Sequence, residues 1–287
     1  MYKNILPAEL LFPILEQFDG DAVTEIRIRA GRPVSIGTGS KYYPLTEFGE
    51  KITATSAMIA SVMSLATENS MYAVTQQLVN GYLNCEGGVR VGVSGEGVRD
   101  KNGISAVKNI TSICIRVPHQ VKGCLDAYKK PVREPGNTLI VSGPGAGKTT
   151  LLRELTRLVS DSGKNCLVID ERGELAAARD GRPALDLGDN TDIYTLIPKA
   201  VAYQNAIRSM APEIIVTDEV FGSAEVAAIE DITRAGVTVF ATVHASSIDR
   251  LKRSGVYKAL PPLFRYFFVL SKTPHPGTVT DFFEGAV

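Results

Sequence analysis

Hydrophobic positions follow two patterns along the chain, and the first covers its N-terminal part. Helical spacing of leucines predicts a helix over Leu6–Phe18, which Pro7 would start and Pro13 would kink. Strict alternation predicts a half-buried strand over Glu25–Arg29, and the alternation resumes at Val34–Ile36. Further elements are expected at Ile59–Ala66 (helix), Gly81–Cys85 with Val89–Val93 (hairpin) and Ile113–Val117 (strand). These local pairings indicate a small α+β domain over residues 1–125.

The second pattern begins after a polar stretch that contains Pro131 and Pro135. We expect residues 126–137 to be a linker and residues 138–287 to form a second domain. In that domain, apolar runs alternate with glycine turns and long helical stretches. The runs are Thr138–Val141, Cys166–Ile169, Ile214–Val216, Val237–Ala241 and Phe264–Leu270. Because runs that are apolar on both faces fit a parallel sheet covered by helices on each side, the predicted fold class is α/β.

Composition narrows the possible functions. The chain has 287 residues, with 31 Lys and Arg against 31 Asp and Glu, so its formal net charge is zero. A broad nucleic-acid surface normally brings a basic excess, and we therefore expect no nucleic-acid partner. The four cysteines show no CxxC spacing, which argues against a zinc site or disulfide framework and favours a reducing, cytosolic compartment. No stretch approaches the ~18–20 apolar residues that span a bilayer, so a soluble protein is expected.

A glycine-rich loop joins the first apolar run of the second domain to an amphipathic helix. A strand, a glycine loop and a helix in this order are typical of a phosphate-binding loop, and they favour it over a chance glycine turn. The expected nucleotide-binding residues are Ser142, Gly143, Pro144, Gly145, Ala146, Gly147, Lys148, Thr149 and Thr150. Lys148 would reach the β- and γ-phosphates, and the Thr149 hydroxyl would hold Mg²⁺. Ser142 stands where such loops usually have their first glycine, a position that tolerates a small residue.

Acidic residues follow two later strands. Because ligands of doubly wound sheets bind at the carboxyl ends of strands, Asp218 and Glu219 should lie near the phosphate loop. Asp218 would steady Mg²⁺ through its waters, and Glu219 could orient and deprotonate the attacking water. Glu171 is an alternative candidate for the base that deprotonates the water. Arg172 beside it could contact a phosphate from its own or a neighbouring subunit. The alternative interpretation is a solvated acidic loop or helix start at each position.

The strand after these ends in two further candidates. Thr242 and His244 alternate onto the same face, so both could sense the γ-phosphate or its water, although a lone histidine is often a packed or surface residue. The preceding helix is expected to have Ser223 as its N-cap and Gly236 as its C-terminal cap. Its buried stripe should be Val226, Ile229 and Ile232, which we interpret as core rather than as an interaction face.

The order of these motifs resembles that of the type II/IV secretion ATPases, a RecA/AAA-like P-loop family. The matching segments are Asp170-Glu171 for the Asp box, Arg208–Glu213 with Asp218-Glu219 for the Arg-x-x-x-Pro-Asp-x-apolar-Gly-Glu segment, and Thr242-x-His244 for the His box. The chain is more similar still to the sporulation branch of this family in endospore-forming bacteria. That likeness is carried by Glu25–Arg32, Gly81–Gly95, Asp170–Glu174 and Met210–Glu213.

The resemblance implies a RecA/AAA-like ATPase core with a parallel central sheet behind a small α+β domain, and it implies ATP and Mg²⁺ as ligands. It also implies a ring, a hexamer in relatives, on the mother-cell face of the forespore membrane under a secretion-like channel. Attachment there would come from sporulation channel membrane proteins as partners. Asp218 replaces the glycine of most secretion ATPases, which makes this strand end closer to a standard Walker B motif. Arginines supplied across subunit boundaries are common in the family, and the candidates are Arg27, Arg29, Arg32, Arg172, Arg179 and Arg182.

We therefore expect an Mg²⁺-dependent, oligomeric ATPase that energises a sporulation channel. Its candidate catalytic residues are Lys148, Glu219, Glu171 and His244. One alternative is a structural ring that binds ATP but hardly hydrolyses it. Another is a nucleic-acid-dependent ATPase, against which the zero net charge and the absence of tryptophan count. No guanine-reading Asn/Thr-Lys-x-Asp motif occurs, and no residue pattern selects adenine.

Overall fold

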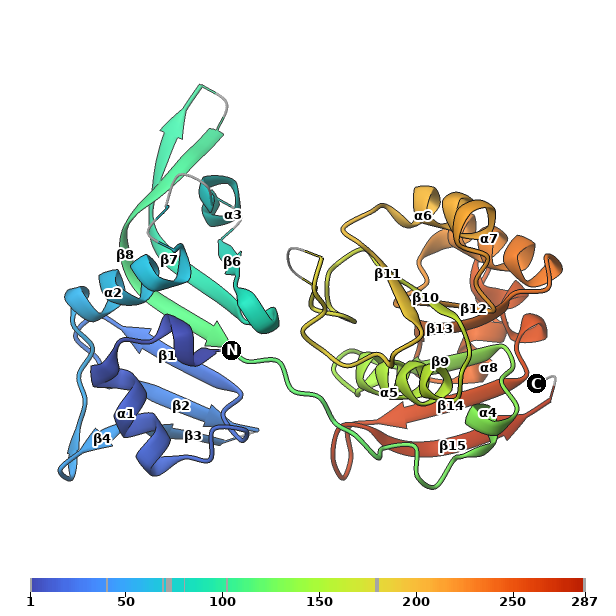
Figure 1. Ribbon diagram of the computed structural model, residues 1–287, viewed down its shortest axis with the longest axis horizontal. Coiled ribbons are helices and arrows are strands. Elements are labelled where there is room, and N and C mark those ends of the chain that lie inside the picture. Colours follow the sequence, from blue (N-terminus) through green and yellow to red (C-terminus); the bar gives the residue numbers. More distant parts are fainter. Residues whose placement is uncertain are drawn as a thin grey trace. The chain divides into compact units, whose positions relative to one another are not determined.

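The computed structural model describes residues 2–39, 41–68, 70, 74–79, 81–101, 103–178 and 181–285. The chain forms two compact units (Figure 1). The first consists of Met1–His119 with Ala178–Ala184, and the second of Gln120–Ala177 with Leu185–Val287. Residues 126–137, the expected linker, therefore belong to the second unit, where they contain the short helix α4 (Lys130–Arg133).

The first unit is built on an antiparallel sheet with strand order β3-β2-β1-β8-β7-β6. Its strands are β1 (Glu25–Arg29), β2 (Ser35–Thr38), β3 (Lys41–Pro44), β6 (Tyr82–Asn84), β7 (Arg90–Asp100) and β8 (Gly103–Arg116), and β4 (Thr46–Glu47) pairs with β5 (Glu50–Lys51). Its helices are η1 (Tyr2–Ile5), α1 (Ala8–Gln17), α2 (Ser56–Ala66), α3 (Thr75–Val79) and η3 (Glu86–Gly88). The predicted α+β pattern of this part of the chain is confirmed.

Alternation along β1 explains how this sheet forms its core. Ile26 and Ile28 are completely buried, and the residues that alternate with them on the other face carry charge, namely Glu25, Arg27 and Arg29. Burial raises the pKa of the Glu25 carboxyl, but hydrogen bonds from Arg27 and Tyr42 outweigh this effect and leave the pKa below its ordinary value. The β7–β8 pair extends well beyond its predicted length. Its outer half is largely exposed and so lacks the apolar alternation from which a strand can be predicted.

The second unit has a sheet with strand order β11-β10-β12-β13-β9-β14-β15, parallel throughout except for the antiparallel pair β14–β15. Its strands are β9 (Thr138–Ser142), β10 (Cys166–Asp170), β11 (Thr191–Thr195), β12 (Ile214–Thr217), β13 (Thr238–His244), β14 (Tyr266–Ser271) and β15 (Thr278–Glu284). Its remaining helices are α5 (Lys148–Asp161), α6 (Lys199–Asn205), η4 (Ala206–Met210), α7 (Gly222–Arg234), α8 (Ile248–Lys252), η5 (Tyr257–Ala259) and η6 (Pro261–Leu263). The predicted α/β class with a parallel central sheet is confirmed.

Helices cover both faces of this sheet. Leu139 and Val141 of β9 share one buried cluster with residues of α6, α7 and α8. Ile140, between them, is also fully buried and points to the opposite face, where α5 packs. Because every central strand is covered on both sides, its sequence is a continuous apolar run rather than an alternating one. Within the described residues, no helix is long and apolar enough to cross a membrane.

The ends of α7 correct one prediction and confirm two. Ser223 is not the N-cap: α7 begins at Gly222, with Phe221 as the N-cap residue. The carboxylate of Glu225 accepts a hydrogen bond from the Phe221 N–H group at 3.2 Å, so a side chain from the first turn binds the N-cap backbone, while the N-cap side chain itself caps no helical N–H group. Gly236 follows the C-cap with a φ of 83° and ends the helix as predicted. The predicted stripe is buried: Val226, Ile229 and Ile232.

Candidate functional site

The loop between β9 and α5 bends tightly at two glycines. Gly145 and Gly147 have φ values of 65° and 93°, in the left-handed region that side chains disfavour. A Cβ on Gly147 would also lie 2.9 Å from the backbone nitrogen of Gly277, which itself donates to the Ala146 carbonyl at 3.0 Å. Glycine is therefore required here for two reasons, backbone conformation and close approach. The resulting loop precedes the N-terminus of a 14-residue helix, a geometry suited to binding phosphate.

Lys148 places its charge inside this loop. Its ammonium group donates to the carbonyl oxygens of Ser142 at 3.2 Å and Gly143 at 3.1 Å, and the side chain is buried. Burial lowers the pKa of Lys148 below its usual value, although the carboxylates of Asp218 and Glu219 oppose the shift. The Lys148 ammonium group is thus held at the base of the loop by carbonyl oxygens, in the field of two carboxylates. A phosphate group bound in the loop would lie next to this charge.

Three strand and helix ends bring hydroxyl and carboxylate oxygens together around Asp218. The Thr149 hydroxyl, from the start of α5, donates to Asp218 Oδ2 at 2.8 Å. The Thr242 hydroxyl, from β13, donates to Asp218 Oδ1, which also accepts from the Glu219 N–H group at 2.9 Å. Hydroxyl and carboxylate oxygens are hard ligands of the kind that Mg²⁺ prefers. The predicted proximity of Asp218 to the phosphate loop is therefore seen in the structure.

Glu219 has a strained backbone that a buried lysine fixes in place. Its φ is 48°, unusual for a residue other than glycine. The Lys199 ammonium donates to the carbonyl oxygens of both Asp218 and Glu219, the latter at 2.8 Å, and to Glu225 Oε2 at 3.1 Å. The Glu219 carboxylate forms an ion pair with Arg172. Lys199 belongs to α6 and to no recognised motif, so the sequence alone gives no signal that marks it as part of the site.

The two acidic residues at the end of β10, Asp170 and Glu171, have different surroundings. The Asp170 carboxylate is buried and accepts hydrogen bonds at 2.8–3.1 Å from three consecutive backbone N–H groups, those of residues 174–176. The buried Arg153 guanidinium holds the same turn by donating to the carbonyls of residues 174 and 175. Asp170 thus shapes the loop after β10, and the neighbouring Glu171 is left exposed.

A cavity of about 470 Å³ joins these groups, which is a usual size for a small-ligand site. Its lining residues are Pro144, Gly145, Gly147, Lys148, Thr149, Thr150, Ile169, Asp170, Glu171, Arg172, Glu174, Lys199, Asp218, Glu219 and Pro276. Among the predicted loop residues, Ser142, Gly143 and Ala146 do not line this cavity, and Ser142 and Ala146 are buried.

His244 does not line this cavity either. It lines a second hollow of about 700 Å³, together with Gly143, Pro144 and Arg250. Of the candidate arginines, Arg172 lies in the cavity, whereas Arg27, Arg29, Arg32 and Arg182 belong to the first unit. Arg179 lies outside the described residues.

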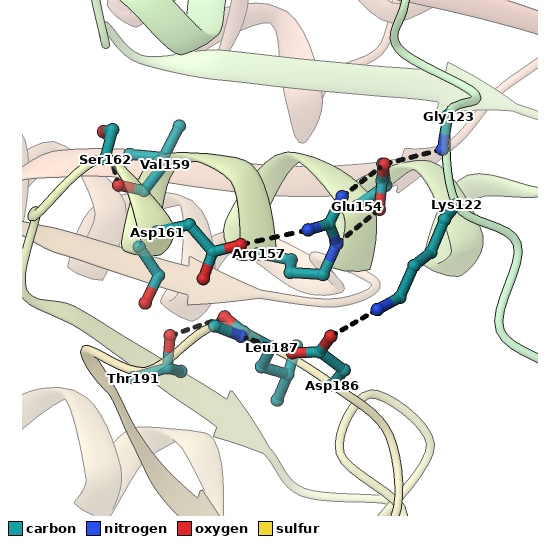
Figure 2. Close-up of polar contacts among 12 residues, drawn as sticks. Lys122, Gly123, Glu154, Arg157, Val159, Asp161, Ser162, Asp186, Leu187 and Thr191 are labelled. Carbon is teal, nitrogen blue, oxygen red and sulfur yellow. Dashed lines mark hydrogen bonds and ion pairs between the residues drawn. The ribbon is translucent and has the colours of Figure 1, made fainter.

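The helix that starts at the phosphate loop is anchored through a buried ion pair (Figure 2). Glu154, with only 1% of its side chain exposed, accepts two hydrogen bonds from Arg157 at 2.9 Å and one from the Gly123 N–H group at 2.7 Å. Arg157 also contacts Asp161 at 3.0 Å. Nearby, the segment of Gly123 is fixed again, because the Lys122 ammonium and Asp186 lie 2.6 Å apart. These contacts tie α5 to the segment that enters the second unit, and we call them the entry clamp.

The sequence pattern of the protein family described as "Sporulation stage III, protein AA" matches residues 3–286. The chain belongs to this family. Stage III sporulation protein AA of Bacillus subtilis is 33% identical over 271 residues, which span 91% of this chain and 87% of that protein.

Two solved structures show the same fold at low sequence identity. The ATPase DotB of Yersinia pseudotuberculosis superimposes with a TM-score of 0.65 at 17% identity, covering 92% of this chain and 75% of DotB. The pilus retraction motor PilT, solved with bound ADP, gives a TM-score of 0.62 at 15% identity, covering 90% of this chain and 77% of PilT. The second unit therefore has the RecA-like P-loop fold that these two structures share, as its motifs predict, and it follows the N-terminal α+β unit in the sequence.

Proposed function

We propose that this protein is an Mg²⁺-dependent ATPase, active as a ring, that energises a secretion-like channel during endospore formation. The observation that carries the proposal is the convergence of Lys148, Thr149 and Asp218 in one cavity beside a glycine loop of the phosphate-binding type. Membership of the sporulation family supports the biological setting. The fold shared with DotB and PilT supports the reaction class.

The residues present fit ATP and Mg²⁺ in number and chemistry. Backbone N–H groups at Gly145 and Gly147 would bind phosphate oxygens, and the Lys148 ammonium would move from its carbonyl partners to the β- and γ-phosphates. Thr149 and Asp218 would hold Mg²⁺, directly or through water. When bound, the ion neutralises charge that develops on the phosphate oxygens. The protein's own contribution is to orient the phosphate chain and to supply a base near its end.

Two carboxylates in the cavity compete for the role of base. Glu219 is held by the Lys199 contacts to its backbone, but its carboxylate is paired with Arg172. Glu171 lines the same cavity. We propose Glu219 as the base, since its position is fixed from two sides. Glu219→Gln should then bind ATP normally and hydrolyse it at least about 100-fold more slowly, whereas Glu171→Gln should retain most turnover. Normal hydrolysis by Glu219→Gln would transfer the role to Glu171.

The central test is ATP turnover by the purified chain and its Lys148→Ala variant, measured by phosphate release with Mg²⁺ present. We expect turnover by the wild type and none by the variant, because the loop loses its buried cation. Lys164→Ala is a control for the change in net charge, since Lys164 lies three residues beyond the end of α5, in a surface ion pair with Glu213. Equal turnover by wild type and Lys148→Ala would refute this site.

One observation favours a second candidate function, a nucleotide-binding ring with little hydrolysis. The Arg172–Glu219 ion pair occupies the carboxylate that would have to accept a proton. If this pair persists with nucleotide bound, the chain would bind ATP tightly and turn it over slowly. The turnover assay separates the two, because only the first function predicts rapid hydrolysis. Particle mass measured with and without ATP·Mg²⁺ tests the ring that both functions predict. In either case we propose membrane attachment on the mother-cell side through partner proteins.

A further inference from the structure

The turn between β14 and β15 lies directly against the phosphate loop. Its Gly277 N–H group donates to the Ala146 carbonyl at 3.0 Å, and its Pro276 lines the cavity. The turn is closed internally, because the Thr278 hydroxyl donates to the His275 carbonyl at 2.7 Å. No sequence motif marks this segment. Only the parallel pairing of β14 with β9 brings it to the edge of the sheet where the phosphate loop begins.

Lys272, the first residue after β14, carries an ammonium group to this loop. Its Nζ lies 3.3 Å, and its Cε 3.4 Å, from the position that a Cβ on residue 145 would occupy. The side chain is exposed, and no residue in the described part of the chain forms a hydrogen bond or an ion pair with it. This lysine is solvated, has no protein partner among the described residues and lies beside Gly145, which we call the apex of the phosphate loop. It is therefore free to contact an anion there.

The other cations near the cavity are differently placed. Arg172 is paired with Glu219, and the Lys199 ammonium is used by two backbone carbonyls and Glu225. Among the described residues, Lys148 is thus the cation inside the loop that donates to backbone carbonyls alone and forms no ion pair. The carboxylates of Glu171, Glu174, Asp218 and Glu219 line the same cavity. A triphosphate entering this cavity meets several negative charges, so a second mobile cation at the loop apex would lower the repulsion.

We propose that Lys272 is a second phosphate-binding residue, whose ammonium group contacts the phosphate chain of the nucleotide across Gly145. The assignment rests on the proposed function, because it requires that the loop binds a nucleotide. Lysine suits this position since its charge is compact and its stem flexible, so it reaches a phosphate oxygen without a fixed bidentate geometry. The turn from Lys272 to Gly277 would then form one wall of the nucleotide site.

The test is a titration of the full chain with a fluorescent ATP analogue in the presence of Mg²⁺, followed by displacement with inorganic tripolyphosphate. Lys272→Ala should raise both the Kd of the ATP analogue and the inhibition constant of tripolyphosphate about tenfold, the loss expected for one partly solvated hydrogen bond to a charged group. Lys272→Arg should stay close to wild type. Lys164→Ala controls for the change in net charge.

Each outcome bears on the proposal separately from the proposed function. If Lys148→Ala abolishes binding while Lys272→Ala binds both ligands like the wild type, the Lys272 assignment is wrong and the ATP site stands. A weaker Kd for the ATP analogue with an unchanged constant for tripolyphosphate would also overturn it, because the contact would then be to ribose or base. Absence of saturable binding by the wild type would overturn both. Thermal unfolding of each variant shows whether a weaker Kd reflects loss of the fold.

Discussion

The entry clamp allows a quantitative test of how the phosphate-loop helix is fixed. Glu154→Ala removes the acceptor of three hydrogen bonds: two from Arg157 and one from the Gly123 N–H group (Figure 2). Breaking a fully buried ion pair costs about 3–5 kcal/mol, because the remaining charge is left without a partner. Here the Arg157 side chain is 15% exposed and keeps Asp161, so we expect the lower end, about 3 kcal/mol of the second unit's free energy of unfolding.

The assay combines urea unfolding, followed by circular dichroism, with hydrogen exchange of the segment that holds Gly123. Glu154→Ala should shift the unfolding of the second unit to lower urea and speed exchange in residues 120–126. Asp161→Ala is the matched control: its side chain is 42% exposed, so the loss should stay below about 1 kcal/mol. Equal losses of stability in the two variants, or unchanged exchange near Gly123 in Glu154→Ala, would show that the buried ion pair does not hold this segment.

Three further predictions concern other parts of the chain. Gly147→Ala should destabilise the second unit by about 2 kcal/mol and abolish nucleotide binding, because the added Cβ strains the backbone and clashes with the β14–β15 turn. Gly163, with φ 97°, has nothing within 4 Å of such a Cβ, so Gly163→Ala should show the backbone strain alone. Calorimetry and binding measurements compare the two variants, and equal effects would contradict this prediction. Lys199→Met should lower kcat more than it raises KM in steady-state ATPase kinetics, because it frees the backbone carbonyls after β12; a change confined to KM would argue against this positioning role. The Glu25 pKa is depressed in the folded state, so its contribution to stability is present above its unfolded pKa and is lost as pH falls through its folded pKa. Below pH 4.5 the thermal stability of the first unit should therefore fall more steeply in the wild type than in Glu25→Gln, and identical slopes would count against this.

Much of the second unit could be predicted from local sequence. The runs before Ser142 and Asp218 are apolar on both faces because they lie inside a covered parallel sheet, and such a pattern is visible without knowledge of any neighbour. The glycines and Lys148 of the phosphate loop are also local, since backbone conformation and helix start are set within a few residues. By contrast, β11 and β15 are only partly buried, and their sequences carry no comparable signal.

Local sequence is enough to predict the strands of the parallel sheet, the phosphate loop and the acids that follow β12, because each is a pattern within one short segment. Which of the polar residues contact one another depends on the tertiary structure. It assigned the Asp170 carboxylate to a backbone turn, set buried Lys199 under Glu219, and brought Lys272 to the loop apex. Such contacts join residues far apart in the chain, and they depend on strand order and packing. Hydrophobic periodicity encodes which side of an element is buried, but it does not encode which side chain of a neighbouring element that side contacts.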